Sequence, residues 1–389
     1  MADQTSLSLQ VYPRIAAIGQ AAWDACAGTG NPFVSYAFLS ALEDSGSVGG
    51  DTGWHPRYTA LVDKAGEVAA VLPAYAKAHS YGEYVFDHAW ANALERAGGR
   101  YYPKLQVAAP LSPVPGPRLL RRPGVSVAAV ARVLEALAGE LDYSSVHITF
   151  CAREEWLGLG EAGWLQRLGM QCHWQNQGYT SFEDFLAALS ARKRKAIRRE
   201  RREAQAGLTV RALSGADLTP EVWRHFYRFY KNTTDRKWGG AYLTPEFFPL
   251  LGERLADRVV LMLAEREGRP IAGALNLLGD GVLHGRNWGC VEDAPFLHFE
   301  LCYYQAIDYA ITHGLRRVEA GAQGENHKIQ RGYLPVPTYS AHFIRHAGLR
   351  RAVADFVEAE QIQLREMMEA LRAEAPYRME EQGYTAPSY

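Results

Sequence analysis

Glu325, His327, Lys328 and Arg331 lie within seven residues of one another, after a short apolar run that ends near Glu319. A carboxylate or an imidazole can relay a proton, and an ammonium or guanidinium group can neutralise negative charge that develops during a reaction. Functional side chains tend to collect on the loops that follow strands. These residues are therefore the first candidates for a catalytic site. An ion network on a surface loop is the alternative.

A strongly basic segment lies upstream of these residues. Eight of the eleven residues from 192 to 202 are Lys or Arg, in a chain whose formal net charge is −1. Such a concentration suits phosphate groups, either of a nucleotide diphosphate or of a nucleic-acid backbone. A solvated helix in which Glu200 and Glu203 pair with their basic neighbours is the alternative. The residues expected to meet phosphate are Arg194, Lys195, Arg198 and Arg199.

The basic segment is expected to be helical. Thr180 and Glu183 have the spacing of a capping box. Phe182, Phe185 and Leu189 follow at helical spacing. The pattern predicts one helix over residues 180–207.

Two segments of the first half are candidates for the wall of a polar cleft. Aromatic and polar residues alternate in residues 79–90, which suits either such a wall or a half-exposed strand. Residues 100–120 are rich in proline and are expected to form a rigid extended loop rather than a regular element. The residues expected to contact substrate from these segments are Tyr81, Glu83, Asp87 and Lys104.

The strand predicted over residues 282–289 adds two candidates. The pleat of a regular strand would place His284, Arg286 and Trp288 on one face and small residues on the other, where the backbone can be approached closely. Arg286 and Trp288, together with Arg331, are expected to bind substrate.

Two similar halves must position these groups. In each half the pattern predicts a hairpin, a further strand, a helix and a short strand, in that order. The hairpins are expected at 57–72 and 258–278, the helices at about 125–141 and 296–313, and the short strands at 145–150 and 317–321. Strands joined in this way form mixed sheets with helices packed on them, so we expect two α+β units in tandem, with a boundary near Met170.

The composition excludes several classes of protein. With 389 residues, of which 48% are hydrophobic, the chain can bury a sizeable core. No apolar stretch approaches the roughly 18 residues of a membrane span, and the N-terminus lacks the order of a signal peptide. We therefore expect a cytoplasmic protein without stable membrane insertion. The five cysteines are scattered and include no C-x-x-C pair, so reduced thiols and no metal site are expected.

Together these segments resemble the FemAB-like group of predicted N-acyltransferases, within the FemABX branch of the GNAT-like acyltransferase superfamily. In the first half the likeness is carried by NPFVSYAFLSALEDSGSVG, HSYGEYVFD and RYYPKLQVAAPLSPVPGPRLL. In the second half it is carried by RVVLMLAEREGRPIAGALNLL, HGRNWG, ELCYYQAIDYAITHGLRRVEAGAQG and NHKIQRGYLP. The resemblance extends over about residues 31–344.

The resemblance implies an α+β fold of tandem GNAT-like domains, with mixed sheets and flanking helices. A degenerate N-terminal domain would occupy residues 1–171, the acyltransferase domain 172–372 and a tail 373–389. The implied reaction moves an acyl or aminoacyl group to an amine. It needs no bound cofactor, because the acyl donor is a co-substrate.

The characterised branch of this superfamily takes its acyl group from an aminoacyl-tRNA and transfers it to a peptidoglycan precursor. A lysine in a Phe-Lys pair stabilises the oxyanion. His327-Lys328 matches that pair, with histidine in place of phenylalanine, so the resemblance assigns this role to Lys328. Glu319, Glu325 and His327 are then the groups expected to relay the proton of the attacking amine.

Two other functions remain open. One is an acyl-CoA-dependent N-acetyltransferase. Glu292, Asp293 and Pro295 stand where such enzymes usually hold pyrophosphate on open N–H groups, which makes an aminoacyl-tRNA the favoured donor. The other is a non-catalytic module that binds a peptide or a nucleic acid. The expected partners are an amine-bearing small molecule or peptide as acceptor and tRNA as donor, and the sequence does not specify an oligomeric state.

Overall fold

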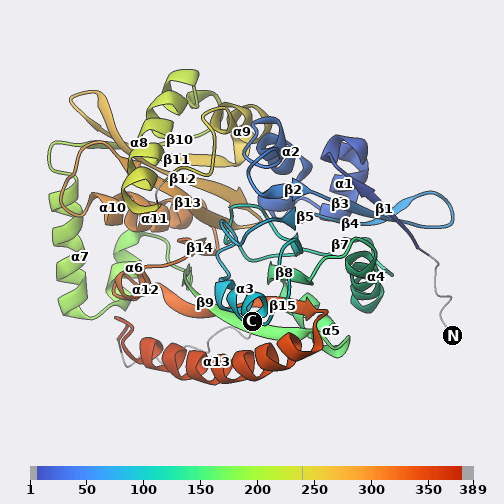
Figure 1. Ribbon diagram of the computed structural model, residues 1–389. Coiled ribbons are helices and arrows are strands. Elements are labelled where there is room, and N and C mark those ends of the chain that lie inside the picture. Colours follow the sequence, from blue (N-terminus) through green and yellow to red (C-terminus); the bar gives the residue numbers. More distant parts are fainter. Residues whose placement is uncertain (1–6, 239, 379–389) are drawn as a thin grey trace. The chain divides into compact units, whose positions relative to one another are not determined.

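The computed structural model describes residues 7–238 and 240–378, and Figure 1 shows their secondary structure. The chain divides into two compact units. Unit 1 comprises Met1–Gly169 and Pro337–Arg365, and unit 2 comprises Met170–Val336 and Glu366–Tyr389. Unit 1 therefore includes Pro337–Arg365. The sequence-based division had placed these residues in the second domain, residues 172–372.

Unit 1 is built from two groups of strands. One is an antiparallel sheet in the order β1-β3-β4-β7, and the other has the order β15-β8-β6-β5-β2. In the second group β6 and β8 are parallel, and the chain passes through α4 between them. The elements are β1 (Ser8–Tyr12), η1 (Ile15–Ala17), α1 (Gln20–Ala27), η2 (Pro32–Val34), α2 (Tyr36–Asp44), β2 (Trp54–Pro56), β3 (Tyr58–Val62), β4 (Val68–Leu72), β5 (Ala74–Lys77), α3 (His88–Arg96), β6 (Lys104–Val107), β7 (Leu120–Arg121), α4 (Val127–Glu140), β8 (Ser145–Cys151) and α5 (Arg153–Glu161). Strands β9 (Leu165–Gln175) and β15 (Leu334–Ile344) and helix α13 (Ala347–Ala373) each pass from one unit into the other.

The core of unit 1 covers one face of the second group of strands. Leu105 of β6 and Val146 of β8 belong to an apolar cluster with Leu134 of α4. The neighbouring residues Lys104 and His147 point to the opposite face, because successive side chains of a strand alternate. That face is also buried, but its side chains are polar.

Unit 2 contains one run of strands in the order β10-β11-β12-β13-β14-β9. Strands β13 and β14 are parallel, and a helical segment connects them. The elements are α6 (Phe182–Ala188), α7 (Ala191–Ala204), β10 (Thr209–Leu213), η3 (Gly215–Asp217), α8 (Pro220–Trp238), α9 (Phe247–Leu255), η4 (Ala256–Arg258), β11 (Val259–Arg266), β12 (Arg269–Gly279), β13 (Val282–Cys290), α10 (Leu297–Phe299), η5 (Glu300–Tyr304), α11 (Gln305–Thr312), β14 (Arg317–Glu319) and α12 (Glu325–Ile329).

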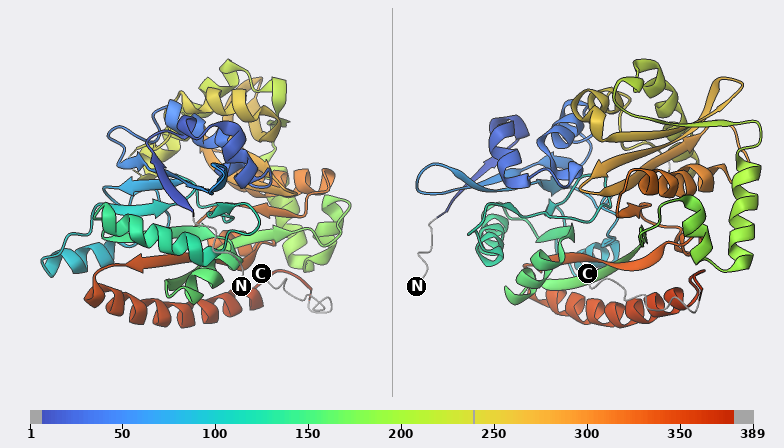
Figure 2. Two further views of the ribbon diagram at one scale, coloured as in Figure 1. Left: turned by 90° about the vertical axis from the view of Figure 1, so that its right-hand side faces the viewer. Right: turned by 180° about the vertical axis from the view of Figure 1, so that it is seen from behind.

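Helices cover both faces of this run, as the two views of Figure 2 also show. On one face, Ala272 and Ala274 of β12 share an apolar cluster with Ile307 of α11. On the other face, α8 lies so close to β13 that a Cβ atom on Gly289 would stand 2.1 Å from the carbonyl oxygen of Phe229. Glycine is required there because a larger residue would push the helix off the sheet.

Most of the regular elements expected from the sequence are confirmed. Both hairpins form, as β3–β4 and β11–β12, and both strand-helix-strand passages follow them. The halves differ in one respect. In unit 1, Pro73 separates β4 from β5 and removes an N–H donor, so the hairpin joins a different sheet from the strands that follow it.

One of the two alternatives for residues 79–90, a half-exposed strand, is excluded, and two further local expectations are wrong. Residues 79–87 form no strand, and helix α3 begins at His88. Residues 100–120 are not loop throughout, because Lys104–Val107 form β6 between β5 and β8. The helix expected over 180–207 is two helices, α6 and α7, and the side chain that caps the first is Ser181, which accepts a hydrogen bond from the backbone N–H of Asp184.

No helix in residues 7–238 and 240–378 is both long and apolar enough to cross a membrane.

Candidate active site

Strand β13 pairs with β14 over only part of its own length. They run side by side from Val282 to His284 on β13 and from Arg317 to Glu319 on β14. Strand β14 ends there, whereas β13 continues to Cys290, and residues 285–288 are partly exposed although they belong to an interior strand. Beyond His284, β13 is therefore no longer paired with β14.

Lys328 follows this point on the loop and helix after β14. Gly324, with a φ of 76°, lets the chain turn into the short helix α12, which carries Lys328 inward. Lys328 is 2% exposed, and its Nζ donates a hydrogen bond to the carbonyl oxygen of Gly321 at 2.6 Å. Burial lowers the pKa of Lys328 to about 8, although the charges of Cys172 and Glu325 act in the opposite direction. A group with this pKa can stabilise an oxyanion and can also exchange a proton near neutral pH.

Glu325 and His327 share helix α12 with Lys328. Glu325 is half-buried, and its charge interacts with that of Lys328. His327 is exposed, and its ring centroid lies 5.5 Å from that of Phe299. Three of the four predicted catalytic residues are thus on one short helix, and of these three Lys328 is the buried one.

The fourth predicted catalytic residue, Glu319, points to another face of the sheet. Its neighbour on β14, Val318, belongs to the same apolar cluster as Cys172 on β9 and Ile329 on α12. Because side chains alternate along a strand, Glu319 faces away from that cluster. The structure therefore does not bring Glu319 together with the residues of α12.

On its own face, Glu319 lies in a buried polar row. It accepts a hydrogen bond from Nδ1 of His284 at 2.9 Å and forms an ion pair with Arg317 at 2.7 Å. Burial raises the pKa of Glu319, but the charges of His284, His173 and Arg317 outweigh burial and hold the pKa well below its ordinary value. Glu319 is thereby an ionised structural group.

A β-bulge changes the expected direction of side chains on β13. His284 is opposite Leu277 and Trp288 is opposite Ala274, so one extra residue, Arg286, lies between these pairs. A bulge of one residue shifts the alternation of the strand. The expectation that His284, Arg286 and Trp288 share a face is therefore wrong, and Trp288 packs against the apolar cluster that contains Ala274.

A row of rings joins β13 to α12. Trp288 lies 5.1 Å from His298, and Phe299 stacks on Tyr303 at 5.9 Å, in each case between ring centroids. Phe299 then meets His327. The chain here includes η5, a single π-helical segment, and such segments occur often at functional sites because they re-aim side chains.

Helix α7 turns one side toward this region. Nη2 of Arg331 donates a hydrogen bond to Glu200 at 2.8 Å, and the Tyr304 hydroxyl donates to the same carboxylate oxygen at 2.5 Å. Arg201 pairs with Glu300, which is fully buried. The solvated-helix alternative expected Glu200 to pair with its basic neighbours on α7. Glu200 instead bonds to Arg331 and Tyr304.

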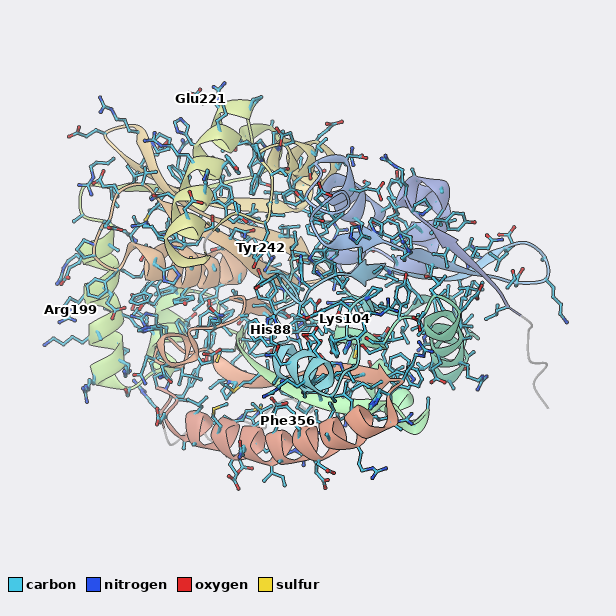
Figure 3. All side chains as sticks on the ribbon, viewed as in Figure 1. His88, Lys104, Arg199, Glu221, Tyr242 and Phe356 are labelled. Carbon is cyan, nitrogen blue, oxygen red and sulfur yellow. The ribbon has the colours of Figure 1, made fainter. Side chains whose placement is uncertain are left out.

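The predicted phosphate-binding residues are not equivalent. Arg194 donates a hydrogen bond to the carbonyl oxygen of Leu189 at 2.8 Å and so helps to end α6. Arg198 pairs with Glu183, and Arg199 lies 3.7 Å from Glu203. Lys195 is exposed and makes no hydrogen bond or ion pair within the described part of the chain. Figure 3 shows Arg199 projecting from α7.

Three predicted substrate-binding residues form a buried ion cluster in unit 1. Nζ of Lys104 donates hydrogen bonds to Glu83 at 2.7 Å, to Ser80 at 2.8 Å and to Asp87. Lys104 is fully buried, and each of its three ammonium protons has an acceptor. The cluster ties the loop of residues 79–87 to β6, while Tyr81 on the same loop is 59% exposed.

Several residues of the site were not anticipated from the sequence. Glu200 is the only acid in the basic run of residues 192–202, and that isolation is a signal that could have identified it. Phe299 and Tyr303 are spaced like ordinary core residues, and the Gly321 carbonyl leaves no trace in the sequence.

Comparison with known proteins gives a family and a fold. The FemAB-like family model, described as peptidoglycan biosynthesis/recognition, matches residues 14–379. The search of curated proteins finds no match.

Solved structures of similar fold cover nearly the whole chain. The C-terminal domain of a proposed lysylphosphatidylglycerol synthetase from Agrobacterium fabrum has a TM-score of 0.54 at 10% identity, covering 88% of this chain and 96% of that one. FemX has a TM-score of 0.53 at 13% identity, covering 87% and 98%. L-PGS from Bacillus licheniformis has a TM-score of 0.50 at 12% identity, covering 85% and 98%. The α+β fold of tandem GNAT-like domains expected from the sequence is confirmed.

Proposed function

Because the chain belongs to the FemAB-like family, we propose that it is an N-acyltransferase that moves an aminoacyl group from an aminoacyl-tRNA to an amine. Family and fold support an acyltransferase that acts on an amine acceptor. The choice of donor and the roles of individual residues are part of the proposal.

The observation that carries the proposal is the environment of Lys328. Its ammonium group is buried, is held by the Gly321 carbonyl and lies on the helix that follows the parting of β13 and β14. A positive charge in such a place has little competition from water, so it stabilises an oxyanion more strongly than an exposed lysine would.

The reaction proceeds by direct attack. The acceptor nitrogen forms a bond to the ester carbonyl carbon, negative charge passes to the carbonyl oxygen, and Lys328 stabilises that charge. The ester C–O bond then breaks and the ribose hydroxyl leaves. The attacking nitrogen gives its proton to Glu325 or His327, and the same group returns a proton to the leaving oxygen. Because the acceptor attacks the donor directly, no covalent enzyme intermediate forms.

Basic side chains on the outer side of α7 favour an acyl donor that carries many phosphate groups. Lys195, Arg198 and Arg199 are exposed on that side. The Glu292 side chain, which pairs with Arg266 at 2.8 Å, supplies negative charge where the pyrophosphate of CoA would need donors. Both observations favour tRNA over CoA.

The acceptor is an amine-bearing small molecule or peptide. The description of the family as acting in peptidoglycan biosynthesis or recognition supports an amine of a peptidoglycan precursor. Arg286 and Trp288 are the proposed contacts on β13. In unit 1, Tyr81 is the exposed proposed contact, and Glu83, Asp87 and Lys104 hold its loop.

The test is a transfer assay with two donor classes. The purified protein is incubated with a radiolabelled charged tRNA pool or with a panel of acyl-CoA compounds, and label in small amines and peptidoglycan-derived peptides is counted. Lys328→Met is the inactive variant, and Arg211→Met, which removes an exposed arginine paired with Glu265 on β11, is the matched control. Transfer from tRNA that is lost only in Lys328→Met supports the proposal. If label is transferred from acyl-CoA alone, the proposed donor is wrong and acyl-CoA takes its place. If the folded protein transfers no label from either donor, the result favours a non-catalytic binding module.

A further inference from the structure

Arg331 is held on three sides, although it is two residues beyond the end of α12. Its Nη1 donates a hydrogen bond to the carbonyl oxygen of His327 at 2.9 Å, and its Nη2 donates to Glu200 on α7 at 2.8 Å. The guanidinium carbon lies 3.5 Å from the ring centroid of Phe299. Arg331 is 6% exposed.

We infer that Arg331 is a positioning residue, which, held by Glu200, fixes the helix that carries Lys328. The catalytic role of Lys328 in this inference rests on the proposed function. The contacts of Arg331 do not depend on it.

Helix α12 needs such an anchor. It has five residues, far fewer than the roughly 12 at which an isolated helix becomes even marginally stable in water. The loop before it contains Gly321, Gln323 and Gly324, all with positive φ, so the backbone before the helix is shaped by turns rather than by a sheet ladder. Tertiary contacts therefore decide where Lys328 lies, namely those of the buried Ile329 side chain within the helix and those made just after the helix.

The contacts of Arg331 fit this role. Its hydrogen bond to the His327 carbonyl engages the last turn of α12, where backbone carbonyl groups lack helical partners. Glu200 is in turn held by the Tyr304 hydroxyl at 2.5 Å, and Lys193 of α7 contacts Gln330. Helix α7 and the π-helical segment η5 thus form one support for the end of α12.

The side chain has to be arginine for this geometry. A planar guanidinium group can donate along two edges while its face lies on an aromatic ring, whereas the ammonium group of lysine is a point charge on a flexible stem. The sequence suggested that Arg331 binds a substrate. Because two edges of its guanidinium group are engaged and one face lies against Phe299, Arg331 is better suited to hold α12 in place.

The experiment measures the chemical reactivity of the Lys328 amine as a function of pH. The protein is treated briefly with an amine-acylating reagent between pH 6 and pH 11, denatured and digested with trypsin. Labelling of Lys328 blocks cleavage after it, so mass spectrometry distinguishes the peptide of residues 318–328 from longer products. Glu325, Cys172 and Cys302 are the charged or titratable groups that act on Lys328 and are kept in every variant.

Four variants are compared with the wild type, in which half-maximal labelling is expected near pH 8. Arg331→Met is expected to raise the midpoint by about one pH unit and the plateau rate several-fold, because a loosened α12 exposes Lys328 to water. Arg331→Lys is expected to behave in the same way although it keeps the charge. Glu200→Gln is expected to shift the midpoint in the same direction by less. Arg211→Met is the matched control and is expected to leave the midpoint unchanged.

Circular dichroism and thermal melting show which variants are folded. A midpoint that stays at the wild-type value in folded Arg331→Met overturns the inference, and so does full rescue by Arg331→Lys, which would mean that charge alone matters. If Arg331→Met does not fold, Glu200→Gln decides, because it releases Arg331 without deleting it. An unchanged midpoint in that variant then counts against the inference.

Transfer kinetics separate this inference from the proposed function. A positioning role lowers kcat and leaves the KM for the donor unchanged, whereas a substrate contact raises KM. A shifted Lys328 midpoint in a protein that transfers no acyl group would leave the positioning role intact and would remove the proposed function alone.

Discussion

Glu319 of unit 2 and His147 of unit 1 occupy the same register position in corresponding strands. Glu319 lies on β14, between His284 of the parallel strand β13 and His173 of the antiparallel strand β9. His147 lies on β8, between Gln106 of the parallel strand β6 and His342 of the antiparallel strand β15. Strands β14 and β8 each follow a crossover helix. The two buried rows are His284, Glu319 and His173 in unit 2 and Gln106, His147 and His342 in unit 1. Buried polar groups are unfavourable unless they are paired, so the same row in both units supports the internal repeat expected from the sequence.

The row in unit 2 predicts a large effect of Glu319→Gln on stability. The change removes the charge that pairs with the partly exposed Arg317 and that accepts a hydrogen bond from the buried His284, and it should lower the free energy of unfolding by about 1–3 kcal/mol. The folded-state pKa of Glu319 is lowered, so its contribution is present above the ordinary glutamate pKa and is lost as pH falls toward the folded-state value. Urea denaturation at pH 7 and pH 4 checks both points. Glu265→Gln, whose partner Arg211 is exposed, is the control, and an equal effect of the two changes would contradict the prediction.

Lys328→Met should stabilise the protein while it abolishes transfer. The folded state lowers the pKa of Lys328 from the ordinary 10.5 to about 8, so holding its proton is unfavourable by about 3 kcal/mol at pH values below 8. This penalty disappears as pH rises from the folded-state to the unfolded-state pKa. The advantage of the variant should therefore be on the order of 1–3 kcal/mol at pH 7 and should shrink above pH 8. A variant less stable than the wild type at pH 7 would show that Lys328 has stabilising contacts that outweigh burial.

The acyl-transfer rate should fall as pH rises through about 8, because the charged form of Lys328 stabilises the oxyanion. The measurement needs an acceptor whose nitrogen is neutral throughout, such as hydroxylamine, so that titration of the acceptor does not hide the effect. Lys328→Arg keeps the charge at all these pH values, so any remaining activity should lose the fall near pH 8. A rate that rises through this range would instead make neutral Lys328 a base.

Binding of tRNA should depend steeply on salt through the outer side of α7. Each phosphate contact contributes about 0.7–0.9 to the slope of log affinity against log salt concentration. Lys195→Glu and Arg199→Glu should each lower the slope by about that amount, as measured by fluorescence anisotropy. Arg194→Glu should in addition destabilise the end of α6, because Arg194 bonds to the Leu189 carbonyl. Arg211→Glu is the charge-matched control, and salt-insensitive binding would rule out the phosphate contacts.

Lys104→Met should be strongly destabilising in unit 1. It leaves the buried carboxylates of Glu83 and Asp87 without their shared cation, which should lower the free energy of unfolding by about 3–5 kcal/mol. The double variant Lys104→Met, Asp87→Asn should lose less than the sum of the single variants, with a coupling energy of about 0.5–3 kcal/mol. Additive losses in chemical denaturation would show that the two groups act independently.

Local patterns in the sequence predicted much of the fold. The apolar runs of β11 and β12, which are separated by a turn, and the helical spacing in α4 and α11 are properties of neighbouring residues. The same patterns placed Glu325, His327 and Lys328 just after a strand, and the structure keeps these three on one short helix.

Pairing between distant residues decided the rest. One bulged residue, Arg286, put Trp288 and His284 on different faces, and alternation on β14 turned Glu319 away from Lys328. The sequence by itself determined that a lysine, an acid and an imidazole would follow a strand of a tandem α+β protein. Only the tertiary structure placed Glu200 against Arg331, 131 positions further along the chain, because burying apolar surface between α7 and η5 fixes contacts that no local pattern encodes.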